Sequence, residues 1–119
     1  MSPDQKEALI KIGVDIDSTM ERFMNNEALF LKCLDKFLSD DCYERMLAAI
    51  DGKDVNAAFD ASHELKGVSA NMGFEHLYEP VKVIVEVFRA GKTDYDPALL
   101  DSIKAAYEET INTVKTVIE

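Results

Sequence analysis

Apolar residues recur at helical spacing along almost the whole chain, and this pattern restricts the possible folds more than any other feature of the sequence. Four stretches carry it: residues 29–50, 55–72, 74–88 and 99–118. Spacings of three and four residues place apolar side chains on one face of an α-helix, and no β-like alternation of useful length occurs. Only 5 of the 119 residues are Gly and 3 are Pro, so little interrupts the helices. We predict an all-α protein.

Turn residues divide this pattern at the places where helices should end. Ser39-Asp40-Asp41 interrupts the first stretch, Asp51-Gly52-Lys53-Asp54 follows it, and Gly73 ends the second. Ala90-Gly91 closes the third stretch. Pro80 lies inside that stretch and removes one backbone hydrogen bond, so we expect a bend there without a break.

Four amphipathic helices with short connections favour an antiparallel, up-and-down four-helix bundle. The chain length suits a single domain over residues 1–119, with the bundle in residues 26–118. Residues 1–24 are less regular because Gly13 and Asp15 divide them. We expect short helical segments there that pack as a cap across one end of the bundle. The four apolar stripes can close on each other, so we expect a monomer.

The composition argues against several classes of partner. Thirteen basic and 23 acidic residues give a formal net charge of −10, which repels nucleic-acid phosphates and anionic lipid headgroups. No apolar run approaches the roughly 20 residues that span a bilayer, and residues 1–11 lack the features of a signal peptide. We therefore expect a cytoplasmic protein that binds neither nucleic acid nor membranes. Cys33 and Cys42 lack CxxC spacing, and Cys33 lies on an apolar stripe as a core residue would.

The second helical stretch carries a distinctive group of residues around one of the two histidines. At 100° per residue, its apolar positions centre near Ser62 and Ser69. A second face, displaced by about 110° from that direction, holds four residues within roughly 100° of one another: His63, Lys66, Gly67 and Ala70. We expect this face at the edge of the bundle, within reach of solvent.

These residue types together suit the transfer of a phosphoryl group. A neutral imidazole has one unprotonated, nucleophilic nitrogen, so His63 can attack phosphorus without a separate base. Lys66, one turn later, can place an ammonium group beside the phosphoryl oxygens. Gly67 lowers helix stability by about 1 kcal/mol relative to alanine, so a glycine inside this helix needs a reason. We attribute its presence to access for a partner protein. With no side chain there and only a methyl group at Ala70, the backbone of a partner can come close.

The run HELKGVSANMG at residues 63–73 resembles the signature of the histidine-containing phosphotransfer (HPt) domain family. In that signature His-x-Leu-Lys-Gly is followed by small residues and ends in Ala-Asn-Leu-Gly, with Met72 in place of the leucine here. The likeness covers residues 13–91 well and the last helix in pattern only. Further similar positions are Gly13-Val14-Asp15, Arg22-Phe23, Leu29-Phe30, Lys36-Phe37 and Leu77.

The resemblance implies a phosphorelay intermediate of two-component signalling. His63 matches the phosphorylated histidine, Lys66 matches the phosphate-contacting lysine, and Gly67 matches the docking glycine. Ala70 and Asn71 belong to the expected docking surface. The family acts as a stoichiometric carrier without an ATP site, so the resemblance implies neither an enzyme nor a cofactor or metal held by this chain.

The expected partners are receiver domains of response regulators and, in some relays, a hybrid histidine kinase. The receiver brings the aspartate and a Mg²⁺ ion. Met1 and the complete bundle favour a free-standing module over a part of a larger kinase.

Three positions depart from the family pattern. Asn25-Asn26 stands where Gly-Asn is common, which bears little on the chemistry. Val85 stands where many members have Gln or Glu, a residue that can orient the histidine from the neighbouring helix, although Glu86 is adjacent. Pro80 can alter the groove beside the site. The sequence therefore leaves open which group orients His63.

Two alternatives from other classes remain. One is a helical protein-interaction module in which His63 is never phosphorylated, an alternative that Val85 keeps open. The other is a metal-binding bundle, which the single pair Asp60-x-x-His63 supports weakly because di-iron bundles repeat Glu-x-x-His with additional glutamates. His76 has no lysine or glycine at matching offsets, so we expect a surface or capping role for it.

Overall fold

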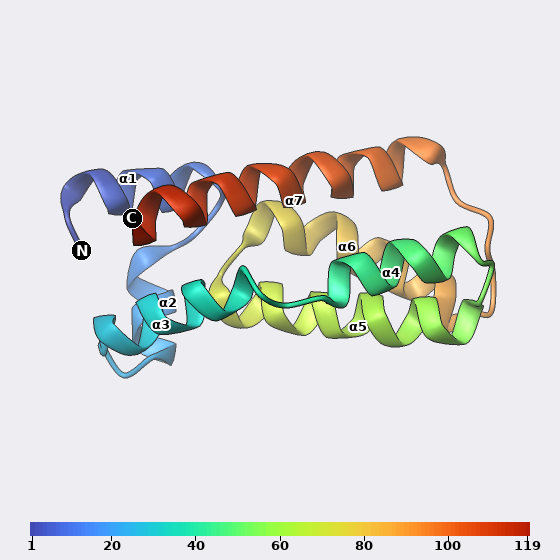
Figure 1. Cartoon of the computed structure of the whole chain (residues 1–119), viewed down its shortest axis with the longest axis horizontal. Coiled ribbons are helices and arrows are strands. Elements are labelled where there is room, and N and C mark those ends of the chain that lie inside the picture. Colours follow the sequence, from blue (N-terminus) through green and yellow to red (C-terminus); the bar gives the residue numbers. More distant parts are fainter.

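The computed structural model describes all 119 residues and contains helices but no strands (Figure 1). This confirms the predicted all-α class. The seven helices are α1 (Pro3–Lys11), α2 (Ile16–Arg22), α3 (Glu27–Phe37), α4 (Cys42–Asp51), α5 (Val55–Met72), α6 (Glu75–Arg89) and α7 (Pro97–Ile118).

The helices form an elongated antiparallel bundle measuring 43 × 24 × 22 Å. Helices α3 and α4 run in the same general direction and together make its first member, while α5, α6 and α7 follow with alternating direction (Figure 1). Each of α4, α5 and α6 packs against the next helix in the chain, and α7 returns to contact α3. The predicted up-and-down four-helix bundle is confirmed, with a first member that is broken in two.

The helix ends lie where the turn residues predicted them. Asp40 accepts a hydrogen bond from the backbone N–H of Cys42 at 2.8 Å, next to the start of α4. Asp54 caps α5 by accepting from the N–H of Ala57 at 3.1 Å. At the other end of α5, Gly73 adopts a left-handed conformation with φ of 78°, which glycine reaches without steric strain.

Helix α6 continues through Pro80, so the expected absence of a break is confirmed, while the bend stays a prediction. The missing N–H of Pro80 removes one hydrogen bond of the second turn, but the buried side chains of α6 continue beyond it from Val81 to Phe88. Packing of this apolar face offsets the lost bond, so the helix reaches Arg89 without interruption.

The N-terminal segments are short helices at one end of the bundle, as the sequence indicated. Helix α1 begins with a capping box, in which Gln5 N–H donates to Ser2 Oγ at 3.1 Å and Ser2 N–H donates to Gln5 Oε1 at 2.7 Å. Gln5 also donates to the carbonyl of Val117 at 2.8 Å, so α1 lies alongside the C-terminal end of α7 (Figure 1). Helix α2 packs against α5. Only α2 therefore lies against the end of α5, whereas α1 runs along α7.

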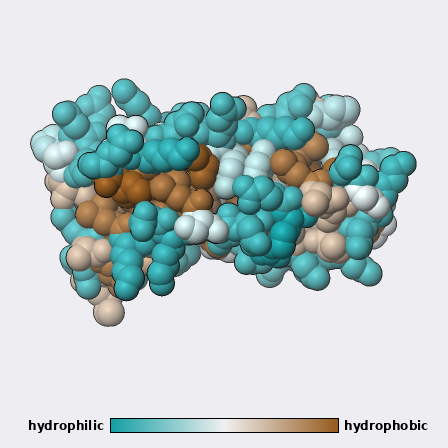
Figure 2. All heavy atoms as spheres, in the orientation of Figure 1, coloured by the Kyte–Doolittle hydropathy of each residue, from teal (hydrophilic) through white to brown (hydrophobic).

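One apolar core connects all of these elements. Its 24 buried apolar residues form a single cluster that includes Leu9, Ile12 and Val14 from the N-terminal segments. No helix combines the length and apolarity needed to cross a membrane. The face in Figure 2 is largely hydrophilic, with an apolar area between the α1–α7 pair and α3.

Candidate functional site

Helix α5 presents one face to the core of the bundle, and that face lies where the sequence placed it. Ser62, Leu65 and Ser69 are each 0% exposed. The two buried hydroxyl groups donate to carbonyls of their own helix, Ser62 to Phe59 at 3.1 Å and Ser69 to Leu65 at 2.8 Å. Because buried polar groups need hydrogen-bond partners, these bonds allow serine to occupy the core side of α5.

The second face of α5 is open to solvent. His63, Gly67 and Ala70 are exposed, and Lys66 is half-buried. A Cβ atom built on Gly67 would meet no other atom within 4 Å. The structure thus brings these four predicted site residues together on one accessible surface.

Helix α6 forms the wall beside this surface. The guanidinium carbon of Arg89 lies 5.0 Å from the centroid of the Phe59 ring, and Tyr78 lines the same hollow as Ala70. An antiparallel register that pairs residue 59 with residue 89, and residue 70 with residue 78, puts Val85 of α6 level with His63. Val85 is 0% exposed, so its hydrocarbon side chain belongs to the core.

Glu86, the polar neighbour of Val85, is held by a charge partner of its own. Arg89 Nε donates to both carboxylate oxygens of Glu86 at 3.2 Å. The contact that the structure gives to the His63 ring is instead with Phe59, whose ring centroid lies 5.5 Å away at an interplanar angle of 28°. The imidazole therefore rests against an aromatic ring of its own helix.

The ion pairs around the site leave Lys66 uncommitted. Glu64, the neighbour of His63, accepts from Arg45 Nη2 at 2.6 Å. On α6, Lys82 lies 3.9 Å from Glu79. The five ion pairs of the structure do not include Lys66, so its ammonium group can interact with an incoming anion.

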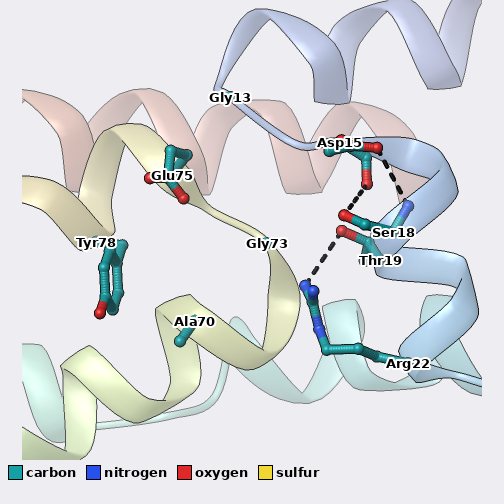
Figure 3. Close-up of a pocket in the computed structure, with 9 residues that line it drawn as sticks. All are labelled: Gly13, Asp15, Ser18, Thr19, Arg22, Ala70, Gly73, Glu75 and Tyr78. Carbon is teal, nitrogen blue, oxygen red and sulfur yellow. Dashed lines mark hydrogen bonds between the residues drawn. The ribbon is translucent and has the colours of Figure 1, made fainter.

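A hollow of about 150 Å³ adjoins the end of the open face at Ala70. Arg22 and Tyr78 line it from opposite sides (Figure 3). Arg22 donates to Thr19 Oγ1 at 3.3 Å, while Asp15 and Glu75 add carboxylates to the lining. The hollow is thus polar and of mixed charge, and it separates the His63 surface from the N-terminal helices.

Asn71 is exposed but lies on another flank of α5. It lines a shallow hollow with Cys33 and Lys36 of α3. Its backbone carbonyl accepts a hydrogen bond from Arg22 Nε at 3.4 Å. The structure does not place it beside α6 with Ala70. Its docking role remains a prediction for the α3 side of the surface.

His76 is exposed near the start of α6, and its backbone N–H donates to the carbonyl of Ile12 at 3.3 Å. This contact ties α6 to the loop after α1 and agrees with the predicted surface position.

Cys33 is half-buried against the core, as expected. Burial raises the pKa of the Cys42 thiol. No group of three or more His, Cys, Asp or Glu side chains is arranged to hold a metal ion.

Two residues that lie beside His63 were not predicted from the sequence as part of the site. Phe59 stands four positions before His63, a spacing that brings two side chains together on a helix, but it also lies within the apolar periodicity of residues 55–72, which is typical of core positions. Arg89 had no detectable signal, because its position over Phe59 depends on the register between α5 and α6. The spacing rule alone could have found Phe59.

The structure is an antiparallel helical bundle. Its α5 offers a partner an accessible imidazole, with a lysine one turn away and free space over a helical glycine. This is the architecture of a phosphotransfer module. A comparison with protein families agrees, matching residues 36–113 to the Hpt domain. The chain belongs to this family. Searches among curated proteins and among solved structures found no match. Hpt domains carry out histidine phosphotransfer in two-component signalling, where they interact with receiver domains and histidine kinases and are not classical enzymes.

Proposed function

We propose that this protein is a phosphorelay intermediate that accepts a phosphoryl group on His63 and passes it from one receiver-domain aspartate to another. The observation that supports this most strongly is the open face of α5. There His63 is exposed, and nothing lies within 4 Å of a Cβ built on Gly67. A receiver can therefore bring its aspartyl phosphate against the imidazole without displacing a side chain at Gly67.

The transfer is an in-line displacement at phosphorus. The unprotonated nitrogen of His63 attacks, the N–P bond forms, and the bond from phosphorus to the aspartyl oxygen breaks so that the aspartate leaves as a carboxylate. The reverse sequence delivers the group to a second receiver. Positioning and charge stabilisation supply most of the rate enhancement in such reactions.

Lys66 supplies the local positive charge in this proposal. It lies one turn from His63 and takes part in none of the ion pairs. In a chain with a net charge of −10, a nearby ammonium group offsets repulsion of the incoming phosphoryl oxygens. Gly67 and Ala70 form the docking surface, and Asn71 extends it toward α3.

The partners follow from the same proposal. We infer receiver domains as donor and acceptor, with a hybrid histidine kinase as a source of the phosphoryl group in some relays, and we expect the Mg²⁺ ion for the transfer on the receiver. We infer that the chain acts in the cytoplasm as a monomer. It works as a stoichiometric carrier, without an ATP site or a cofactor of its own.

The direct test is to incubate the chain with a phosphorylated receiver and to assay acid-labile phosphate on it. We expect His63→Gln to abolish the label completely, because glutamine has no nucleophilic ring nitrogen. Folding should be retained, since an exposed side chain is removed. His76→Gln is the matched control and should be labelled like the wild type.

The same experiment decides between the relay and the interaction module. If the chain binds receivers from a broad panel but never acquires acid-labile phosphate, the relay is wrong and a binding role of the same surface replaces it. Equal labelling of wild type and His63→Gln would place the phosphoryl group on a different residue.

A further inference from the structure

The family pattern left the orientation of His63 unexplained, because valine stands at the position from which glutamine or glutamate can hold the ring. The structure sharpens this problem. Val85 is fully buried and has no polar group to offer. Glu86 is engaged through both carboxylate oxygens with Arg89 at 3.2 Å. Neither residue of α6 makes a hydrogen bond to the imidazole in the structure.

The ring of Phe59 occupies the position from which His63 can be held on α5 itself. Side chains of an α-helix lean toward its N-terminus, so His63 lies over the turn that carries Phe59. The ring centroids are 5.5 Å apart with an interplanar angle of 28°, within the range of an offset aromatic stack. Such a stack fixes the plane of the imidazole while both nitrogens stay at the ring edge.

Phe59 is itself held from the neighbouring helix. It is half-buried against the core, and Arg89 of α6 lies over its ring at 5.0 Å from the centroid. Glu86 in turn fixes Arg89. The contacts thus form a chain that runs from Glu86 through Arg89 and Phe59 to His63. This chain couples the position of the imidazole to the packing of α5 against α6.

We propose that Phe59 is the positioning residue for His63. Its aromatic stack with the imidazole, supported by Arg89, takes the role that a polar side chain at position 85 could play. The inference rests on the proposed phosphotransfer at His63. Phe59 touches neither the receiver nor the phosphoryl group in this role. It acts by holding the imidazole in the orientation from which its nitrogen reaches phosphorus.

The size of the effect follows from the number of orientations that an unheld histidine can adopt. Its first side-chain torsion has three staggered positions and its second is broad and roughly two-fold. If one of these combinations is reactive, loss of the stack lowers the maximal transfer rate roughly three- to tenfold. Affinity for the receiver should change little, because the docking surface at Gly67 and Ala70 is intact.

The stack can be tested without any partner, through the ring proton signals of His63 in NMR spectra of the full chain. A neighbouring aromatic ring shifts these signals, so Phe59→Leu should move them toward random-coil positions. Phe59→Tyr should keep them shifted because it retains the ring. Unchanged His63 signals in Phe59→Leu would overturn the stack.

The consequence is tested by single-turnover transfer from a phosphorylated receiver over a range of concentrations. We expect Phe59→Leu to lower the maximal rate three- to tenfold with little change in the half-saturating concentration, and Phe59→Tyr to restore it. Tyr43→Leu is the control for general loss of aromatic packing, since it breaks the Tyr43–Tyr107 stack between α4 and α7. That variant should transfer at the wild-type rate.

The outcomes separate the two proposals. If the wild type acquires no phosphate on His63, the proposed function fails and the role of Phe59 fails with it. If the wild type is labelled on His63 but Phe59→Leu transfers as fast, only the positioning role is wrong. A raised half-saturating concentration with an unchanged maximal rate would make Phe59 a docking residue instead.

Discussion

Two glycines on α5 show opposite uses of the same residue. Around Gly67, in the middle of the helix, a Cβ atom would enter empty space. At Gly73, which ends the helix with φ of 78°, a Cβ atom would clash with Thr19 Oγ1. The first glycine keeps a surface free, whereas the second lets the chain turn against α2.

The difference separates residues kept for a partner from residues kept for the fold. Nothing inside the chain requires glycine at position 67, where alanine would be the better helix former. Position 73 requires glycine twice, for its backbone conformation and for its contact with Thr19. Substitutions at the two sites should therefore change stability in opposite directions.

Gly73→Ala should have the largest effect on stability. The left-handed conformation is strained for alanine by about 1 to 2 kcal/mol, and the contact with Thr19 adds to this, so we expect a loss of about 3 kcal/mol in the free energy of unfolding. The thermal midpoint should fall by roughly 10 °C. Urea and thermal unfolding measure both quantities.

The background Thr19→Ala tests the cause of that loss. Without Oγ1 the added methyl group has more room, so Gly73→Ala should be less destabilising there than in the wild type. An equal loss in both backgrounds would assign the whole effect to the backbone conformation. If Gly73→Ala left the free energy of unfolding unchanged, the contrast drawn between the two glycines would be wrong.

Gly67→Ala should raise the free energy of unfolding by about 0.5 to 1 kcal/mol, because alanine restricts the unfolded chain and fits the helix. The same methyl group occupies the surface proposed for docking, so we expect weaker receiver binding. Urea unfolding combined with a binding titration makes the measurement. A gain in stability with unchanged binding would show that access is not the reason for this glycine.

Lys66→Ala should have the smallest effect on stability, within about 0.5 kcal/mol, since Lys66 lies off the core face and forms no ion pair. Transfer should slow about tenfold, which corresponds to about 1.4 kcal/mol of activation free energy. Lys66→Arg is the control that retains the charge. Strong destabilisation by Lys66→Ala would contradict the division of α5 into two faces.

Much of the fold was predictable because local signals and global packing agree. The apolar stripes predicted the four bundle members, and Gly73 marked the end of α5. The start of α1 was also encoded, since Ser2 and Gln5 have the spacing of a capping box, with Pro3 as the first helical residue. The path of α1 along α7 could not be predicted, because it depends on contacts between the two ends of the chain, such as Gln5 with Val117.

The candidate site was predictable only where it lies on a single helix. A helical wheel was sufficient to group His63, Lys66 and Gly67, because their relation is set by the helix itself. The surroundings of His63 also depend on which residue of α6 lies over Phe59. That register is set by packing of buried side chains along the whole interface, and Arg89 carries no local sign of it.

The position of His63 near the middle of α5 has a kinetic consequence. The helix is capped by Asp54 at its start and by Gly73 at its end, so fraying at either end should not reach the imidazole. In the proposed relay, donor and acceptor receivers must use this one face in turn. Their exchange would then follow ping-pong kinetics, in which an excess of unphosphorylated acceptor competes with the donor and slows the loading of His63.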